Sequence, residues 1–298
     1  MFVRSLLNRA LWGIKWRYRY RWHPALRDNL RGYTALAAAR CWWHVRKPQK
    51  AHDLPGDLVI SLTSYEPRFN TLVFTLRCLL SQTIRPDRTV LWLAHGDTSI
   101  PPEIVDLCQY GLEIRYTTDI KSYKKIIPSL RAFPHAFIVT ADDDTYYGPH
   151  WLEHLIKAWE KDQHQIVCRV ARQVTLNQDG SSKAYKDWEY ASAPEVSPSL
   201  LPIGVGGVLY PPNSLHPDVL DEQTFQELCP SGDDLWLYWM GRRAKTIYKK
   251  IGGPGVPPTW PTSQKRSLFH ENLLMSKNDQ QIGALTRHFG FPVKAQPN

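Results

Sequence analysis

Long hydrophobic runs are missing from the sequence, since no apolar stretch reaches the about 18 residues that a membrane-spanning helix needs. No internal repeat is visible, and the N-terminus lacks both the apolar core and the cleavage site of a signal peptide. The five cysteines are widely spaced and include no CxxC pair. We therefore expect no transmembrane helix, no signal peptide, and free thiols in a reducing compartment.

Acidic side chains are scarce near the N-terminus. Residues 1–50 hold 12 Lys and Arg but one acid, Asp28, for a net charge of +11, whereas the rest of the chain has a net charge of −2. Within this region, residues 2–16 show the apolar spacing of an amphipathic helix, and residues 16–22 alternate aromatic side chains with arginine. Residues 35–45 form a second helical stretch, which carries two tryptophans.

The basic N-terminal segment, residues 1–50, has several readings. A basic amphipathic helix with Trp and Tyr beside it suits an anionic membrane surface. The same composition can bind RNA through phosphate contacts and stacking, or can form a helix that packs on the rest of the chain. We expect a membrane-surface or packing arm and do not expect a nucleic-acid partner. A mitochondrial presequence would look similar, but the mixed Trp and Arg run argues against it.

Strands and helices alternate from residue 58 onward, after a Pro- and Lys-containing linker. Short apolar, β-branched runs predict strands at 58–63, 89–94, 112–116, 137–141 and 166–170. Helical spacing predicts helices at 69–81, 122–130 and 149–161, with others near 101, 233 and the C-terminus. This alternation predicts an α/β domain with a mostly parallel sheet and helices on both faces.

Three consecutive carboxylates, Asp142, Asp143 and Asp144, follow the strand at 137–141. The carboxyl edge of an open α/β sheet is where ligands bind. Because residues i and i+2 of an extended chain point the same way, we expect Asp142 and Asp144 to face one Mg²⁺ or Mn²⁺, with Asp143 on the other side. An acidic turn that caps the helix near Pro149 is the alternative, but a cap needs only one acid.

A second acidic site, Asp233 and Asp234, precedes an apolar run that predicts a helix. Helix capping explains one of these acids and leaves the other available as a general base. Between the two acidic sites lies a long loop, residues 177–200, which is rich in Ser, Pro, Asp and Lys. We expect it to close over a substrate, with Trp188 and Tyr190 stacking on a sugar or base, or packing in the core or in a lid.

The order of these parts over residues 56–280 resembles the GT-A glycosyltransferases, nearest to the family-2-like enzymes of bacterial surface polysaccharide synthesis, such as those of capsule or lipopolysaccharide. The Asp-x-Asp motif of that family matches Asp142 to Asp144, and its acidic pair matches Asp233 and Asp234. The resemblance implies a Rossmann-like GT-A domain at residues 51–298. The Gln-x-x-Arg-Trp signature is absent, which favours single-sugar addition over polymer extrusion.

The resemblance also implies the activity. A sugar passes from a nucleotide donor, expected to be a UDP-sugar, to a glycan or lipid-linked acceptor. The expected location is cytoplasmic, peripheral at the inner face of the cell membrane.

The resemblance assigns roles to particular side chains. Asp234, with Asp233 as the alternative, is the expected general base of an inverting reaction. Mn²⁺ or Mg²⁺ is expected on Asp142, Asp144 and His270. Contacts with the donor nucleotide are expected from Thr63, Tyr65, Arg68, Asp97, Lys124, Lys125, Asp142 and Asp143. Ordinary alternatives are a turn cap for the acid at 97, a solvated face for the two lysines and a structural role for the histidine.

Two other functions remain open from the sequence. A metal-dependent phosphoesterase or nuclease would use the acidic triplet in a two-metal site. A non-catalytic polyanion-binding protein would act through the basic arm.

Overall fold

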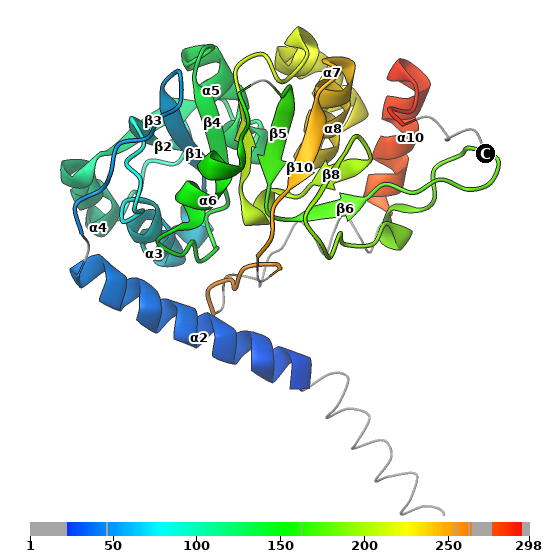
Figure 1. Ribbon diagram of the computed structural model, residues 1–298. Coiled ribbons are helices and arrows are strands. Elements are labelled where there is room, and N and C mark those ends of the chain that lie inside the picture. The colour runs from blue at the N-terminus through cyan, green and yellow to red at the C-terminus, as the bar shows by residue number, and fades with distance from the viewer. Residues whose placement is uncertain are drawn as a thin grey trace, which may run out of the picture.

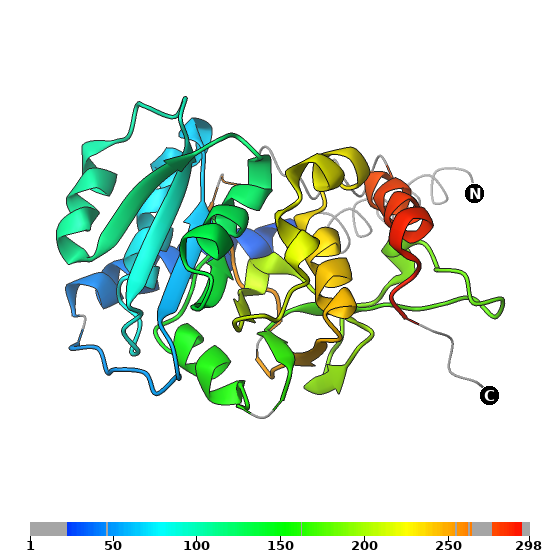
Figure 2. The ribbon, with the colours of Figure 1, turned by 90° about the horizontal axis from the view of Figure 1, so that it is seen from above.

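A single central sheet organises the molecule (Figures 1 and 2). The computed structural model describes residues 23–45, 47–161, 163–253, 255–261, 263 and 276–293. Within these ranges, eight strands follow the order β3-β2-β1-β4-β9-β5-β10-β7. Their bounds are β1 (Leu58–Thr63), β2 (Arg88–Ala94), β3 (Leu112–Thr117), β4 (Phe137–Ala141), β5 (Gln165–Cys168), β7 (Glu195–Ser197), β9 (Val208–Tyr210) and β10 (Ile247–Lys250). A small separate sheet pairs β6 (Ala171–Gln173) with β8 (Leu200–Pro202).

The sheet is mostly parallel, as the sequence predicts. β1 runs parallel to both β2 and β4, β2 to β3, and β5 to β10. β9 enters antiparallel between β4 and β5, and β7 closes one edge antiparallel to β10. The predicted α/β architecture is therefore confirmed.

Helices cover both faces of this sheet. The α-helices are α2 (His23–His44), α3 (Phe69–Leu79), α4 (Pro102–Val105), α5 (Ile127–Ala132), α6 (Trp151–Ala158), α7 (Glu222–Leu228), α8 (Asp233–Arg243) and α10 (Lys277–Phe289). The short 3-10 helices used below are η2 (Glu66–Arg68), η3 (Asp106–Tyr110), η4 (Lys121–Lys125) and η6 (Gly204–Gly206).

Strand alternation divides the core into two layers. Leu58, Ile60 and Leu62 of β1 pack in the layer that includes α2, α3 and α6. Val59 of the same strand and Ile138 of β4 pack in the opposite layer, with η4, α7, α8 and α10. Side chains on both faces of the central strands are therefore buried. This explains why the sequences of these strands are nearly continuous apolar runs.

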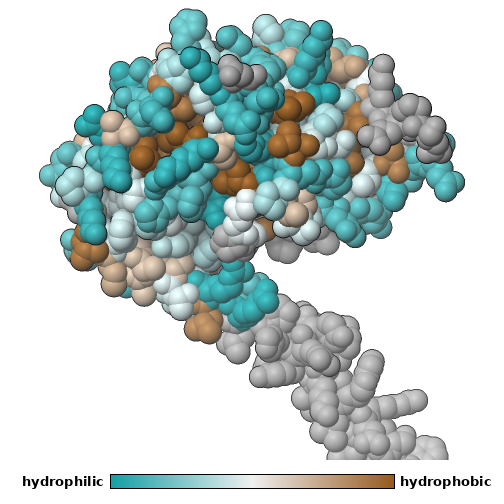
Figure 3. All heavy atoms as spheres, in the orientation of Figure 1, coloured by the Kyte–Doolittle hydropathy of each residue, from teal (hydrophilic) through white to brown (hydrophobic). Residues whose placement is uncertain are grey.

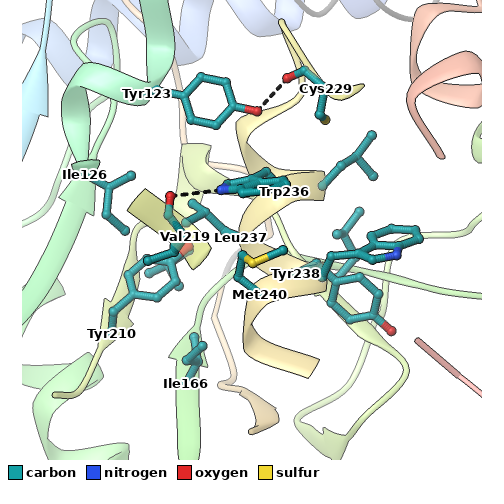
Figure 4. Close-up of a cluster of buried hydrophobic side chains, with 14 of the residues drawn as sticks. Tyr123, Ile126, Ile166, Tyr210, Val219, Cys229, Trp236, Leu237, Tyr238 and Met240 are labelled. Atoms are coloured by element: carbon teal, nitrogen blue, oxygen red, sulfur yellow. Dashed lines mark hydrogen bonds between the residues drawn. The ribbon is translucent and has the colours of Figure 1, made fainter. Parts of the chain in front are cut away.

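Trp236 on α8 lies at the centre of the second layer (Figure 4). Its Nε1 donates to the Val219 carbonyl at 3.1 Å, so the buried indole has a polar partner. Nearby, the Tyr123 hydroxyl of η4 donates to the Cys229 carbonyl at 2.5 Å, just before α8 begins. These contacts fix the first turn of α8 beside η4, and that turn carries the acidic pair.

The chain makes a long excursion between β5 and β9. It leaves β5 after Cys168 and enters β9 at Val208, and these two residues pair with each other. Between them the chain adds β7 to the edge of the sheet beside β10. The return passes through Gly207, whose φ is +84° and where a Cβ would lie 2.4 Å from the Trp151 ring. Only glycine fits at this close approach, and it brings η6 to the carboxyl end of β4.

α2 packs against the domain and begins earlier than the sequence indicates, since the predicted helix at 35–45 starts at His23. Its Trp42 Nε1 donates to the Ser81 carbonyl beyond α3 at 2.7 Å. The predicted helix at 2–16 and the run at 16–22 lie outside the described residues. In the part that is described, no helix has the length and apolar character to cross a membrane.

Candidate functional site

A cavity of about 880 Å³ lies where β1 and β4 end. Its wall combines the loops after these strands with η4, η6, the start of α8, segment 256–259 and part of α2. Most of the predicted site residues line it, namely Thr63, Tyr65, Arg68, Lys124, Lys125, Asp142, Asp143, Asp144, Asp233 and Asp234. Parallel pairing of Leu62 with Ala141 explains why the first loop and the acidic triplet meet.

The acidic triplet lies in a turn rather than in β4, which ends at Ala141. Asp143 accepts hydrogen bonds from Ser64 Oγ and Arg68, both at 2.6 Å, and Asp144 lies 3.2 Å from the same guanidinium. The alternation of side chains along a strand therefore does not apply to the triplet, and the pairing of Asp142 with Asp144 on one cation stays a prediction. Strand geometry has ended before the triplet, and Asp143 and Asp144 share one arginine.

Burial and mutual repulsion perturb these acids. Burial raises the pKa of Asp144 to about 7, with Asp143 adding to the effect and Arg68 opposing it. Burial also raises the pKa of Asp143, against the pull of the same arginine. Burial alone would lower the pKa of Arg68, but the two carboxylates outweigh it and raise the value.

Lys125 connects the triplet with the acidic pair. Its buried ammonium lies 3.1 Å from Asp142 Oδ1 and 2.9 Å from Asp233 Oδ2. Burial would lower the Lys125 pKa, but the carboxylates of Asp142, Asp233 and Asp234 raise it well above its ordinary value. The lysine is therefore held charged between two acidic sites that are far apart in the sequence.

The two members of the acidic pair have different surroundings. Asp233 uses one oxygen to accept from Ser122 Oγ at 2.9 Å and the other to pair with Lys125. Asp234 accepts from the Gly204 amide, with both oxygens at 3.2 Å. Burial raises the pKa of Asp234 to about 7, with Asp233 adding to the effect and Lys125 opposing it.

Other predicted residues lie elsewhere. Asp97 accepts from the Ala94 amide at 3.1 Å, which makes it a turn cap, and it is not part of the cavity wall. The structure gives no support to its predicted donor contact. Lys124 lines the cavity but pairs with Asp119 at 2.6 Å. His270 lies outside the described residues.

The long loop contributes two aromatic side chains to the cavity wall, Tyr185 and Tyr190. Tyr190 lines it and is 44% exposed, whereas Trp188 is fully buried. Arg172 stacks over Tyr190 at 4.2 Å and over Tyr185 at 4.9 Å, and it donates to the Trp188 carbonyl. The packing reading therefore applies to the tryptophan, and Tyr190 is held at the cavity by a cation–π contact.

The residues fit a divalent cation by their chemistry. Among the described residues, five buried or half-buried carboxylates surround the cavity floor, and Lys125 and Arg68 pair with them there. Hard cations prefer such oxygen donors, and a surplus of negative charge favours binding one. Among the described residues, no cluster of three His, Cys, Asp or Glu side chains forms a ready ligand set. Asp142 and Asp144 remain the candidate ligands.

Sequence reasoning missed three contributors to this site. Ser64 and Ser122 each donate to a carboxylate, and Gly204 supplies the amide that faces Asp234. A Cβ on Gly204 would lie 2.8 Å from the Lys125 ammonium, so the glycine makes room for it. A glycine-rich stretch is visible in the sequence, but its partner depends on the antiparallel entry of β9.

Comparisons with known proteins give similarity in structure only. No protein-family model and no curated protein matches the sequence. Glucosyl-3-phosphoglycerate synthase from Mycobacterium tuberculosis, solved with Mn²⁺, UDP and glucosyl-3-phosphoglycerate, is 12% identical, with a TM-score of 0.44 over 83% of this chain and 89% of that one. S. aureus TarS 1–349 is 16% identical, with a TM-score of 0.43 over 79% and 72%.

A third solved structure, inositol-1-phosphate CTP transferase from T. maritima, is 10% identical, with a TM-score of 0.40 over 76% of this chain and 97% of that one. We draw no functional conclusion from similarities of this size. The fold and the cavity define an α/β protein with an acidic site at the carboxyl edge of its sheet.

Proposed function

We propose that the protein is a metal-dependent glycosyltransferase that uses a nucleotide-sugar donor and a glycan or lipid-linked acceptor. One observation carries this proposal. The acidic triplet and the acidic pair, which are the two motifs of the GT-A resemblance, meet on either side of Lys125 in one cavity. Burying carboxylates is destabilising unless each has a partner. Acids that served only in surface turns would therefore stay in solvent and would not gather around one buried lysine.

The donor half of the site consists of the loop after β1 and the triplet. Thr63, Tyr65 and Arg68 line the cavity, which supports the predicted contacts with the donor nucleotide. Arg68 is charged, and its ion pair with Asp143 holds the guanidinium in place at the cavity. From this position it can bind a diphosphate. A UDP-sugar remains the expected donor.

A divalent cation would be held by Asp142 and Asp144. When bound, Mn²⁺ or Mg²⁺ supplies positive charge opposite the leaving diphosphate. His270 stays a predicted further ligand. The protein's own residues orient the diphosphate through Arg68 and balance the acidic floor through Lys125.

Asp234 is the proposed general base. Both oxygens of Asp233 are engaged, by Ser122 and by Lys125, whereas Asp234 has a backbone amide as its partner and lines the cavity. It can accept a proton from an acceptor hydroxyl as that oxygen attacks the anomeric carbon, which corresponds to an inverting reaction.

The cellular setting is the last part of the proposal. The basic segment 1–50 supports peripheral attachment at the cytoplasmic face of a bacterial membrane, and the resemblance supports a role in surface polysaccharide synthesis. The division into this segment and a catalytic domain at residues 51–298 also stays a proposal.

The test is a donor screen. The purified chain is incubated with Mn²⁺ and a panel of nucleotide sugars, and thermal shift and slow donor hydrolysis are measured. We expect Asp144→Asn to abolish donor hydrolysis without loss of the folded state. The matched control is Asp97→Asn, which changes an acid that also follows a strand but lies outside the cavity. Full activity of the Asp144 variant, or hydrolysis of a plain phosphodiester instead, would remove the proposal.

A further inference from the structure

α2 contacts the rest of the molecule through one face. Ala35, Ala39 and Trp43, each four residues apart, are buried against the domain. Near the start of the helix, Arg31 donates to the Val256 carbonyl at 3.0 Å. Figure 1 shows α2 running beneath the segment that follows β10. The inner face of the helix is thus fully accounted for.

The outer face of α2 is mainly apolar, with Thr34 and His44 as its exposed polar residues, and its apolar side chains have no partner among the described residues. Leu30, Tyr33 and Val45 are 64%, 59% and 62% exposed, and Ala37 and Cys41 are exposed as well. At helical spacing these side chains form one stripe, about 22 Å long at 1.5 Å per residue. Figure 3 shows tan and pale atoms along the edge of the molecule where α2 lies.

The charges beside this stripe have one sign. Arg27 and Arg40 are exposed on its flanks, and residues 29–50 contain no acid. The acid of this region, Asp28, lines the cavity on the inner side. Residues 1–22 add six Lys and Arg and no acid to the sequence before the helix.

We propose that the outer face of α2 docks on an anionic lipid bilayer. An apolar stripe enters the boundary between headgroups and acyl chains, while flanking arginines contact anionic headgroups. A symmetric contact between two copies of the stripe fits less well, because it would bring Arg27 and Arg40 of both copies together without an acid to pair them.

Docking of α2 has a consequence for the cavity, which rests on the proposed function. Asp28 and Arg31, on the opposite side of the helix, belong to the cavity wall. A helix that lies in the headgroup layer therefore holds the cavity beside that layer. The acceptor that this arrangement suits is one carried by a lipid, rather than a glycan free in solution.

The test uses the native thiol on the stripe. Cys41 and Cys108 are exposed and the other three cysteines are buried. The full chain with Cys108→Ser is labelled at Cys41 with an environment-sensitive dye and mixed with vesicles of phosphatidylcholine and phosphatidylglycerol. We expect a blue shift and brighter emission. Pure phosphatidylcholine vesicles should give a much smaller change.

The control places the same dye on the far side of the molecule. A chain with Cys41→Ser, Cys108→Ser and Glu227→Cys carries it on α7, which lies opposite α2 in Figure 1. This label should not respond to vesicles.

A second measurement, flotation with the same vesicles, uses paired substitutions. Leu30→Glu with Tyr33→Glu should lower the bound fraction by about tenfold or more, since acids repel the anionic surface. Val196→Glu with Tyr116→Glu, which alters exposed apolar residues of β7 and β3, should not.

Two outcomes would overturn the proposal. An unchanged Cys41 signal on fully bound protein would show that the stripe stays in water. A signal that rises with protein concentration in the absence of vesicles would assign the stripe to a second copy of the chain. Neither measurement needs a donor or an acceptor, so failure here leaves the proposed transferase activity standing, and the reverse also holds.

Discussion

At the residue scale, the ammonium of Lys125 balances the negative charge of two carboxylates in the site. It is buried and pairs with two carboxylates that enter from β4 and α8. Removing one partner of such a buried pair leaves uncompensated charge in a poorly solvated place. The neighbouring Lys124 is also buried, but its partner Asp119 is 64% exposed and can be solvated when alone.

The first prediction follows from this difference. Lys125→Met should lower the free energy of unfolding by about 3–5 kcal/mol, because the buried acids lose their counter-charge. Lys124→Met should lower it by clearly less. Chemical denaturation of both variants gives the comparison.

A double variant provides the check. Adding Asp233→Asn to Lys125→Met should recover part of the loss, since it removes one of the stranded charges. Equal losses in the two single lysine variants would contradict the pairing described for Lys125.

Sequence patterns locate the acids of this site but not their partners. The edge position of Asp142 to Asp144 follows from a buried strand followed by carboxylates, and the structure has them there. The contact between Ser122 and Asp233 joins residues 111 positions apart and depends on how α8 packs on η4. Asp97 also follows a strand, as the acidic triplet does. Its carboxylate, however, accepts a hydrogen bond from the Ala94 amide of its own turn.

At the element scale, periodicity predicts the parallel half of the sheet well. β1 and β4 have the predicted bounds, 58–63 and 137–141. β10 was missed because Tyr-Lys-Lys dilutes its apolar signal, and the lysine side chains use their stems as packing surface. The predicted helix at 122–130 divides into η4 and α5, with Pro128 in the first turn of the second.

The first residue of β1, Leu58, is hydrogen-bonded to the loop that precedes β2. Asp87 accepts from the Leu58 amide at 2.7 Å and pairs with His52 at 2.8 Å. Its burial alone would raise the pKa of this carboxyl, but the Leu58 amide and His52 outweigh burial and lower it. A lowered pKa in the folded state means that the ionised carboxylate stabilises the fold.

The second prediction concerns pH. Stabilisation from Asp87 should be fully present above its unfolded pKa of about 3.9 and should fade as the pH falls through the lower, folded value. Asp87→Asn should therefore have a lower melting temperature than the parent chain near pH 7. The gap should close as the pH is lowered through the folded-state pKa of Asp87, which lies below its unfolded value. A gap that stays constant across this range would contradict the assignment.

At the scale of the whole molecule, the net charge is distributed unevenly along the sequence. Residues 1–50 carry the positive excess and the remaining chain is slightly acidic. Among the described residues of the cavity wall, carboxylates outnumber basic side chains, and the wall includes part of the basic helix α2. A ligand that brings both a cation and a phosphate would complement this arrangement better than either alone.

The third prediction tests that complementarity. Mn²⁺ with UDP should raise the melting temperature more than the sum of the two separate shifts, and a chelator should reverse it. At one hundred times the dissociation constant the added stability is about 2.7 kcal/mol. Asp142→Asn should lose the combined shift, while Asp97→Asn should keep it. Equal shifts in both variants would argue against Asp142 as a ligand.

The segment between β5 and β9 begins and ends at paired residues of the sheet, since Cys168 pairs with Val208. Its anchor points are therefore independent of its length. This segment carries Tyr190 and η6 into the cavity while β1 and β4 remain untouched, and it also supplies β7 to the edge of the central sheet beside β10. On the proposed function, substitutions around Tyr190 in this segment offer a route to new acceptor preferences, because they leave the loops after β1 and β4 unchanged.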